Sequence, residues 1–226
     1  MPTKQTSTRN RDPQLLERLG ALHVAVISDC LDKIGLRDQV MAQRIRALTP
    51  ESRVAGYAAT VHLVTVDSPP DDPKDAYRGE IEALEGLAPG DVMVVSTCPG
   101  SYWGELLATA SRHLGAVGVV ADAYTRDTAT LVEMGFSTFI AGISPLDSLG
   151  RTDVDAYDVP IECGGVSVNP GDLVLGDRDG VVVVPRDRAE EVIGGAETKV
   201  GAEREMREDL RRGRPMSEAF ATYGIL

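Results

Sequence analysis

Short apolar runs rich in β-branched residues alternate with segments of helical spacing through the middle of this 226-residue chain. The apolar runs cover residues 60–66, 91–96, 117–122 and 137–142, and the helical patterns between them cover residues 77–86, 105–114 and 128–135. Continuous apolar runs of this length are typical of strands buried on both faces, and helices between such strands are typical of α/β sheets. The alternation therefore predicts an α/β fold.

The last third of the chain adds β structure of a different kind. From residue 159 onward, β-branched runs are separated by turns at residues 169–172 and 177–180, where Asn, Pro, Gly and Asp favour tight reversals. No internal repeat, low-complexity tract or linker separates this part from the rest. A chain of this size buries roughly 70% of its unfolded surface on folding, so we predict one domain over residues 1–226.

Helices are predicted at both ends of the chain. Asp12, followed by proline, is placed to cap a first helix, and Gly35 is placed to end a second. Asp187 is predicted to cap a long charged helix that ends near residue 213, with a short helix over residues 217–224 after it. The interior of the long helix contains three glycines, Gly194, Gly195 and Gly201. Because glycine disfavours a helix, we expect packing on a neighbouring subunit to compensate.

The net charge of the chain limits the classes of partner that it can bind. Its 23 Lys and Arg residues stand against 35 Asp and Glu residues, for a formal net charge of −12, which opposes binding to a phosphate backbone. No apolar stretch approaches the roughly 20 residues that span a bilayer, and residues 1–12 lack the apolar centre of a signal peptide. We expect a cytoplasmic protein that binds neither nucleic acid nor membranes. The widely spaced Cys30, Cys98 and Cys163 are predicted to be small buried residues.

The stretch "GELLATASRHLGAVGVVADAYTRD", residues 104–127, concentrates the candidate chemistry. Glu105 opens a predicted helix whose first backbone N–H groups are free to bind a small carboxylate or phosphate. Arg126 and Asp127 follow a predicted strand, and ligands often bind near strand ends in α/β proteins. A cation, an acid and an anion-binding helix end are therefore expected to converge.

The same three residues also have structural roles open to them. Asp127 is well suited to cap the helix over residues 128–135, and the residues alone favour this cap over a metal ligand. Glu105 stabilises a helix N-terminus whether or not it takes part in chemistry. Arg126 could pair with a nearby carboxylate. Both interpretations stay open on these grounds.

The stretch and its surroundings resemble the signature of the RraA-like family, in which an acid is followed after twenty residues by Arg-Asp. The flanking segments "ISDCLDKIG", "PGDVMVVS" and "NPGDLVLGDRDGVVVVP" agree with this resemblance. The family includes class II aldolases acting on 4-hydroxy-4-methyl-2-oxoglutarate and 4-carboxy-4-hydroxy-2-oxoadipate. The resemblance implies a three-layer β/β/α fold related to swivelling phosphohistidine domains. It also implies a homotrimer or dimer of trimers, with active sites completed by a neighbour's C-terminal segment.

Roles for individual residues follow from the resemblance. Asp127 resembles the direct ligand of a Mg²⁺ or Mn²⁺ ion, and Glu105 matches an acid that holds a water on that ion. Arg126 is expected to contact the 2-oxo acid substrate and to stabilise the enolate formed from it.

Substrate binding and completion of the site are implied for further positions. Gly104 and the backbone amides of Leu106 and Leu107 would receive the substrate carboxylate. Glu203, with Glu205 as the alternative, would supply a carboxylate to the adjacent subunit's site.

The chain departs from the family pattern in two places. Position 105 is Glu where well-studied aldolases carry Asp, and residues 69–87 replace an Asn-centred segment, so that Tyr77 and Arg78 could line a different pocket. The predicted function is a divalent-metal-dependent lyase that cleaves a 4-hydroxy-2-oxo acid to pyruvate and a second carbonyl compound, with oxaloacetate decarboxylation as a side activity. The alternative is a non-catalytic regulatory protein of the RraA type that binds an RNase E-like partner.

Overall fold

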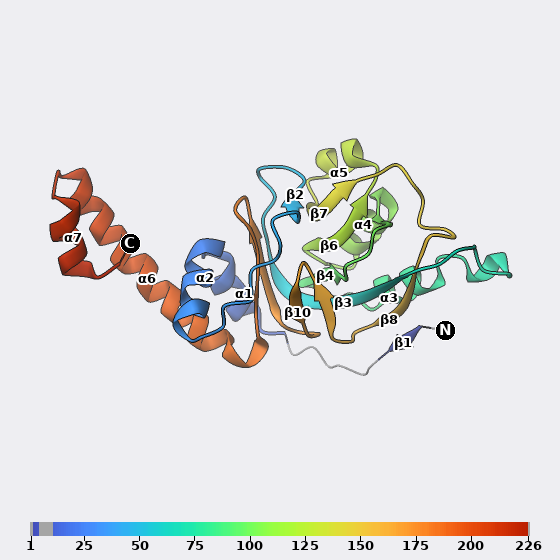
Figure 1. The fold of residues 1–226 in the computed structure, drawn as a ribbon, viewed down its shortest axis with the longest axis horizontal. Coiled ribbons are helices and arrows are strands. Elements are labelled where there is room, and N and C mark those ends of the chain that lie inside the picture. The colour runs from blue at the N-terminus through green and yellow to red at the C-terminus, as the bar shows by residue number, and fades with distance from the viewer. Residues whose placement is uncertain (1, 5–10, 226) are drawn as a thin grey trace.

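The computed structural model describes residues 2–4 and 11–225. Two groups of helices lie on either side of the β structure, and the C-terminal helices extend away from it (Figure 1). Of the polar stretch at residues 1–12, positions 1 and 5–10 lie outside the described residues.

Four parallel strands form the centre of the larger sheet. They are β3 (Val54–Thr65), β4 (Asp91–Val95), β6 (Gly118–Thr125) and β7 (Ser137–Ile143), in this order across the sheet. All four predicted strands are confirmed, although β3 and β6 are longer than predicted. β3 begins at Val54 because its first residues pair with a strand from the last third of the chain.

Shorter strands extend this sheet and cover it. They are β1 (Thr3–Lys4), β2 (Arg46–Ala47), β5 (Ser101–Trp103), β8 (Thr152–Tyr157), β11 (Leu173–Asp177) and β12 (Gly180–Val184), together with the separate hairpin of β9 (Ile161–Cys163) and β10 (Val166–Val168). The β-rich last third and its turns are confirmed. The short strand β5 forms directly before α4 because Trp103 pairs with the end of β6.

Alternate residues of the parallel strands face two different cores. Val92 and Val94 pack toward β9 to β12, whereas Met93 and Val95 pack toward the helices on the other side. Those helices are α3 (Arg78–Glu85), α4 (Glu105–His113) and α5 (Thr128–Met134). The two faces thus separate a second β layer from a helical layer, which confirms the predicted β/β/α arrangement.

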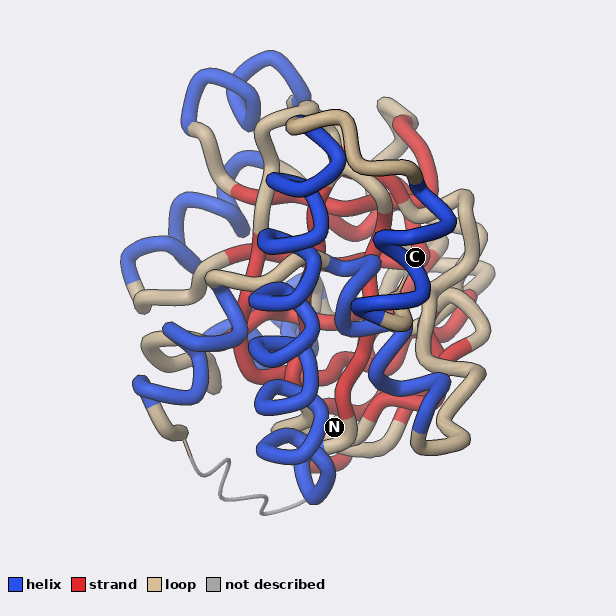
Figure 2. The backbone as a smooth tube through the Cα atoms, turned by 90° about the vertical axis from the view of Figure 1, so that its left-hand side faces the viewer, coloured by secondary structure: helices blue, strands red, loops and turns tan. Residues whose placement is uncertain are grey.

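Further helices pack on the outer face of β11 and β12, as the helices in front of the strands in Figure 2 show. They are α1 (Pro13–Gly20), α2 (Val24–Lys33) and α6 (Ala189–Arg211). Asp12 caps α1 as predicted, accepting a hydrogen bond from Gln14 N–H at 2.9 Å. The prediction that Asp187 caps the long helix is wrong. Asp187 lies in a 3₁₀ turn that follows Pro185, so α6 begins later.

The far end of α6 continues beyond the sheets, and α7 (Met216–Tyr223) packs back on it (Figure 1). An added Cβ at Gly194 or Gly201 would meet no atom within 4 Å, so neither glycine is needed for packing inside this chain. Packing on a neighbouring subunit stays a prediction. None of the described helices has the length and apolar character needed to cross a membrane. The three cysteines are buried and free, as predicted.

A buried carboxylate ties the β9–β10 hairpin to the parallel sheet. Asp122 on β6 accepts hydrogen bonds from Arg44 Nε at 2.8 Å and from Gly164 N–H at 3.1 Å, and also from the Thr97 hydroxyl. Its side chain is only 2% exposed. Burial alone would raise the pKa of Asp122, but these hydrogen bonds outweigh burial and hold the pKa below its ordinary value.

We expect Asp122→Asn to lower the free energy of unfolding at neutral pH by about 2–4 kcal/mol, because Arg44 loses its charged partner. A lowered pKa in the folded state stabilises the protein above the ordinary carboxyl pKa, and this gain is lost as the pH falls through the lowered value. The difference between wild type and variant should therefore shrink below about pH 4. Urea unfolding of both proteins, at neutral pH and below about pH 4, measures this difference in the free energy of unfolding. Glu190→Gln, at an exposed ion pair, should change stability by under about 1 kcal/mol, and equal losses in both variants would contradict the argument.

Candidate active site

The pairing of β5 with the end of β6 brings residues 104 and 126 together. Arg126 N–H donates to the carbonyl oxygen of Trp103 at 3.0 Å, and the hydroxyl of Thr125 donates to the same oxygen at 3.0 Å. Both strands run in the same direction and end at the same edge. The start of α4 and the Arg-Asp pair are therefore neighbours, as the sequence predicts.

Asp127 adopts an unusual backbone conformation at this edge. Its φ of 58° and ψ of 31° lie in the left-handed region, which non-glycine residues seldom occupy. The side chain makes no capping bond to α5, so the predicted cap is wrong. In this conformation the carboxylate turns toward α4 instead, and its Oδ2 accepts from Glu105 N–H at 3.2 Å. Strain of this kind is frequent at functional sites.

A cavity of about 360 Å³, here called the Arg126 cavity, opens beside these residues. Five predicted site residues line it: Gly104, Leu106, Leu107, Arg126 and Asp127. The backbone N–H groups of Leu106 and Leu107 lie in the first turn of α4, where a helix has no internal partners for them. The cavity therefore combines a guanidinium, a carboxylate and an anion-binding helix end.

Two other predicted acids lie outside the wall of this cavity. Glu105 turns its carboxylate along α4, where Oε1 accepts from the Thr109 hydroxyl at 2.8 Å. Glu203 lies on α6, 3.8 Å from the ammonium of Lys199. Because α6 and α4 are on opposite sides of the molecule in Figure 1, Glu203 does not join the site of its own chain. Glu205 is exposed on the same helix.

Asp147 joins the site without having been predicted there, whereas Tyr77 lines the cavity as the sequence analysis allowed. Asp147 lies 3.2 Å from Arg126 Nη1 and accepts a 2.7 Å hydrogen bond from the hydroxyl of Tyr77. The Tyr77 hydrogen bond, with the charge of Arg126, lowers the pKa of Asp147. Asp147 follows β7, the parallel neighbour of β6, and this placement was the signal that could have found it. Arg78 lines neither this cavity nor the next, and pairs with Asp75 and Glu82.

Glu80 is a buried acid in the wall of the Arg126 cavity. It is 6% exposed and lies on α3 at the helical spacing of the buried Ala83 and Leu84. Burial raises the pKa of Glu80 to about 7, although a hydrogen bond with Ser148 opposes the rise. An acid at a core position of a helical pattern was the sequence signal for it.

Two further polar atoms in residues of this wall are buried without a partner among the described residues. They are the hydroxyl of Ser101 and the indole nitrogen of Trp103. Buried polar groups in folded proteins normally find a hydrogen-bond partner. Both groups therefore lack, among the described residues, the partner that buried polar groups normally have, although neither polar atom is itself exposed.

The donor set fits a hard divalent cation. The described residues contain no group of three or more side chains suited to ligate a metal. Mg²⁺ retains several waters and needs only one or two carboxylates, and the half-exposed Asp127 provides one. A Cβ at position 104 would lie 2.9 Å from Asp127 Oδ2, so Gly104 leaves the room that this carboxylate occupies.

The chain is similar to known proteins over most of its length. Residues 24–183 match the family model RraA-like, described as Aldolase/RraA. The chain is 32% identical, over 76% of its own length and 77% of the relative's, to a Halalkalibacterium halodurans protein named "Putative 4-hydroxy-4-methyl-2-oxoglutarate aldolase".

Solved structures share the fold of the chain. An uncharacterized protein from Pseudomonas syringae has a TM-score of 0.78 at 26% identity, covering 92% of this chain and 97% of that one. Streptomyces coelicolor RraAS2 is described as an unusual member of the RNase ES inhibitor RraA protein family. It has a TM-score of 0.76 at 30% identity, covering 91% of this chain and 100% of that one.

Glu80→Gln should make stability less dependent on pH. Because burial raises the pKa of Glu80 to about 7, the wild type loses stability as the pH rises from the ordinary carboxyl pKa through that value, at about 1.4 kcal/mol per pKa unit. The neutral variant avoids this loss. Urea unfolding from about pH 5 to about pH 8 should show the free energy of unfolding of Glu80→Gln rising relative to that of the wild type. The exposed Glu85→Gln should show the same pH dependence as the wild type. Parallel curves for Glu80→Gln and wild type would refute the assignment.

Proposed function

Because the chain belongs to the RraA-like family, we propose that it is a lyase that cleaves a 4-hydroxy-2-oxo acid to pyruvate and a second carbonyl compound. One observation carries the proposal: Arg126, Asp127 and the start of α4 converge on a single cavity. A guanidinium and free helix amides suit a 2-oxo carboxylate, and a lone carboxylate suits a hard cation beside them.

In this proposal the chain binds and orients the substrate. The N–H groups of Leu106 and Leu107 hold its carboxylate, and Arg126 contacts the 2-oxo group. Asp127 would hold Mg²⁺ or Mn²⁺, which when bound supplies a Lewis acid for the 2-oxo group. Asp147 fixes the guanidinium of Arg126 at 3.2 Å, so that its donors are in place before the reaction begins.

The reaction breaks the bond between C3 and C4. Its electron pair passes to C3 to form the enolate of pyruvate, and Arg126 stabilises the developing negative oxygen. Glu105 would turn from the Thr109 hydroxyl, which it contacts at 2.8 Å, and together with Glu203 of a neighbouring subunit would orient a water that removes the 4-hydroxyl proton. C3 then takes up a proton. Oxaloacetate decarboxylation forms the same enolate, so it should occur as a side activity.

The rim of the cavity supports a site shared between subunits. Ile81, Leu106 and Leu146 line the cavity and are 49%, 78% and 52% exposed. Large apolar side chains gathered at one rim mark interaction surfaces. We propose a homotrimer or a dimer of trimers in which the neighbour's α6 covers this rim.

The second candidate function is that of a regulatory protein without catalysis. It is favoured by the likeness to Streptomyces coelicolor RraAS2 and its description as a member of an RNase ES inhibitor family. The discriminating experiment measures pyruvate release from a panel of 4-hydroxy-2-oxo acids and from oxaloacetate, with Mg²⁺ or Mn²⁺ and after chelation. Metal-dependent pyruvate release supports the lyase. No release from any substrate, with retention of an RNase E-like partner, supports the regulator.

Arg126→Lys should lose most of its activity, by about 100-fold or more in kcat/KM, because lysine keeps the charge but lacks the planar fork. Steady-state kinetics on whichever panel substrate is cleaved measures the loss. Arg78→Lys is the matched control, since Arg78 lies on the adjoining segment but outside the cavity wall. Unchanged kinetics for Arg126→Lys would remove Arg126 from the site.

Mixed oligomers test the shared site. Asp127→Asn and Glu203→Ala should each be nearly inactive. Co-expressed one-to-one mixtures should regain roughly a quarter of wild-type activity, because each site needs an intact Asp127 from one subunit and an intact Glu203 from its neighbour in the ring. Asparagine tolerates the left-handed backbone of position 127, so the first variant should fold normally. Activity no higher than the parents', in mixed oligomers verified by mass, would exclude a role for Glu203 in a neighbour's site. Glu205→Ala would then be tested in the same way.

A further inference from the structure

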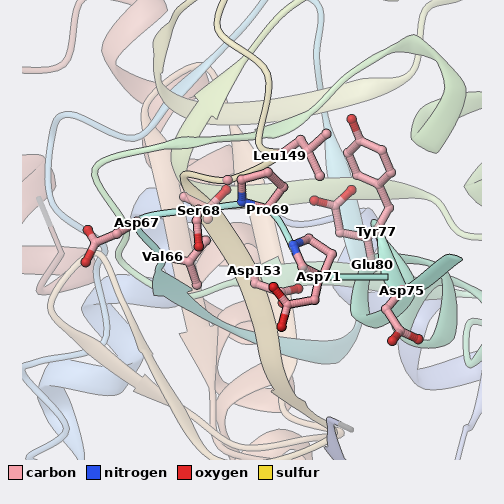
Figure 3. Close-up of a pocket in the computed structure, with 13 residues that line it drawn as sticks. Val66, Asp67, Ser68, Pro69, Asp71, Asp75, Tyr77, Glu80, Leu149 and Asp153 are labelled. Carbon is pink, nitrogen blue, oxygen red and sulfur yellow. The ribbon is translucent and has the colours of Figure 1, made fainter. Parts of the chain in front are cut away.

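A second cavity of about 360 Å³, here called the acidic cavity, adjoins the Arg126 cavity. Tyr77 and Glu80 belong to the walls of both, and Figure 3 shows them at one side of the acidic cavity. A ligand held at Arg126 therefore has Tyr77 and Glu80, the wall shared with the acidic cavity, on one side of it.

The wall of the acidic cavity carries negative charge. Its acids are Asp67, Asp71, Asp75, Glu80 and Asp153, and the described residues that line it include no Lys or Arg. Arg78 neutralises one of them through its 2.9 Å contact with Asp75. The remaining acids have no cation in the wall to offset them.

The Arg126 cavity offers one cation for a substrate. Among the described residues in its wall, Arg126 is the sole Lys or Arg, and it already faces Asp147 at 3.2 Å and Asp127 at 3.8 Å. One substrate carboxylate can be neutralised by Arg126 and the helix end. A second carboxylate, on the side of the acidic cavity, would face several acids and no Lys or Arg among the described residues of that wall.

Neutral hydroxyl groups also belong to the walls of the two cavities. The hydroxyl of Tyr77 lies in the shared wall, where it donates to Asp147 at 2.7 Å. Ser68 carries a further hydroxyl in the wall of the acidic cavity, whereas the Thr152 hydroxyl already donates to the carbonyl oxygen of Ser101 at 3.0 Å. Hydroxyl groups of a ligand can pair with such donors and, unlike a carboxylate, can also donate to the surrounding acids.

We propose that this site selects 4-hydroxy-2-oxo acids with a single carboxylate and a neutral, hydroxylated distal end, and that it discriminates against dicarboxylates. The inference rests on the proposed function for the reaction itself, and on the charges of the two cavities for the choice of substrate. It differs from the dicarboxylate substrate in the name of the Halalkalibacterium halodurans relative.

A matched pair of substrates tests the proposal. 4,5-Dihydroxy-2-oxopentanoate and 4-hydroxy-2-oxoglutarate differ only in a CH₂OH or a carboxylate at C5. In each, the C3–C4 bond breaks, the 4-hydroxyl loses its proton and C3 gains one, giving pyruvate with glycolaldehyde or glyoxylate. We expect kcat/KM to favour the dihydroxy acid by roughly tenfold or more, since like charges placed together penalise a wrong partner.

Charge variants locate the discrimination. Asp153→Asn should reduce this preference several-fold by raising kcat/KM for the dicarboxylate. The double variant Asp71→Asn, Asp153→Asn should reduce it further. Asp155→Asn is the control, because Asp155 lies on the same strand but pairs with His62 outside both cavities. A wild-type preference for the dicarboxylate, or a preference unmoved by the double variant, would overturn the proposal.

A binding measurement separates this proposal from the reaction. 5-Hydroxy-2-oxopentanoate and 2-oxoglutarate lack the 4-hydroxyl, so neither can undergo the cleavage. Calorimetry with excess Mg²⁺ should show the hydroxy acid binding roughly tenfold tighter or more. If no substrate is cleaved but this preference holds, the lyase assignment fails and the specificity stands. If 2-oxoglutarate binds equally well or better, or if neither ligand binds, the specificity is wrong.

Discussion

The long strand β3 is the constraint on which the rest of the structure depends. Its twelve residues pair with β4 on one side and, on the other, with β11 in the first part and β8 in the second. One strand therefore joins the parallel sheet to the β-rich last third. Parallel pairing then passes from β4 to β6 and β7, and their carboxyl ends meet at one edge, where Arg126 and Asp127 lie.

Elements with a strong local pattern could be predicted from the sequence. The continuous apolar runs of β4, β6 and β7 are buried on both faces, and the Asp12 cap depends only on the residues beside it. The strands β5 and β8 were missed, because β5 is three residues long and exists through its pairing with β6, and β8 alternates acids with apolar residues. Asp187 failed as a cap because Pro185 begins a 3₁₀ turn there.

The candidate site divides in the same way. Gly104 and Asp127 could be predicted as neighbours because one helix and one strand separate them, a unit that returns the chain to the same sheet edge. The direction of the Asp127 carboxylate could not be predicted, because it depends on a left-handed backbone conformation that the residue type does not indicate. Asp147 and Glu80 reach the cavity from other elements, so only the assembled sheet places them.

In the proposed function, different segments of the chain carry the chemistry and the selectivity. Residues 104–127 supply the guanidinium, the carboxylate and the helix end, whereas residues 66–80 line the distal side. Tyr77 links the two parts: it adopts a left-handed backbone with φ of 58° at the start of α3, and its hydroxyl reaches Asp147, the partner of Arg126. The α3 helix that starts there places Glu80 between the cavities. Changes in residues 66–80 can thus alter which distal group is accepted while Arg126 and Asp127 keep their positions.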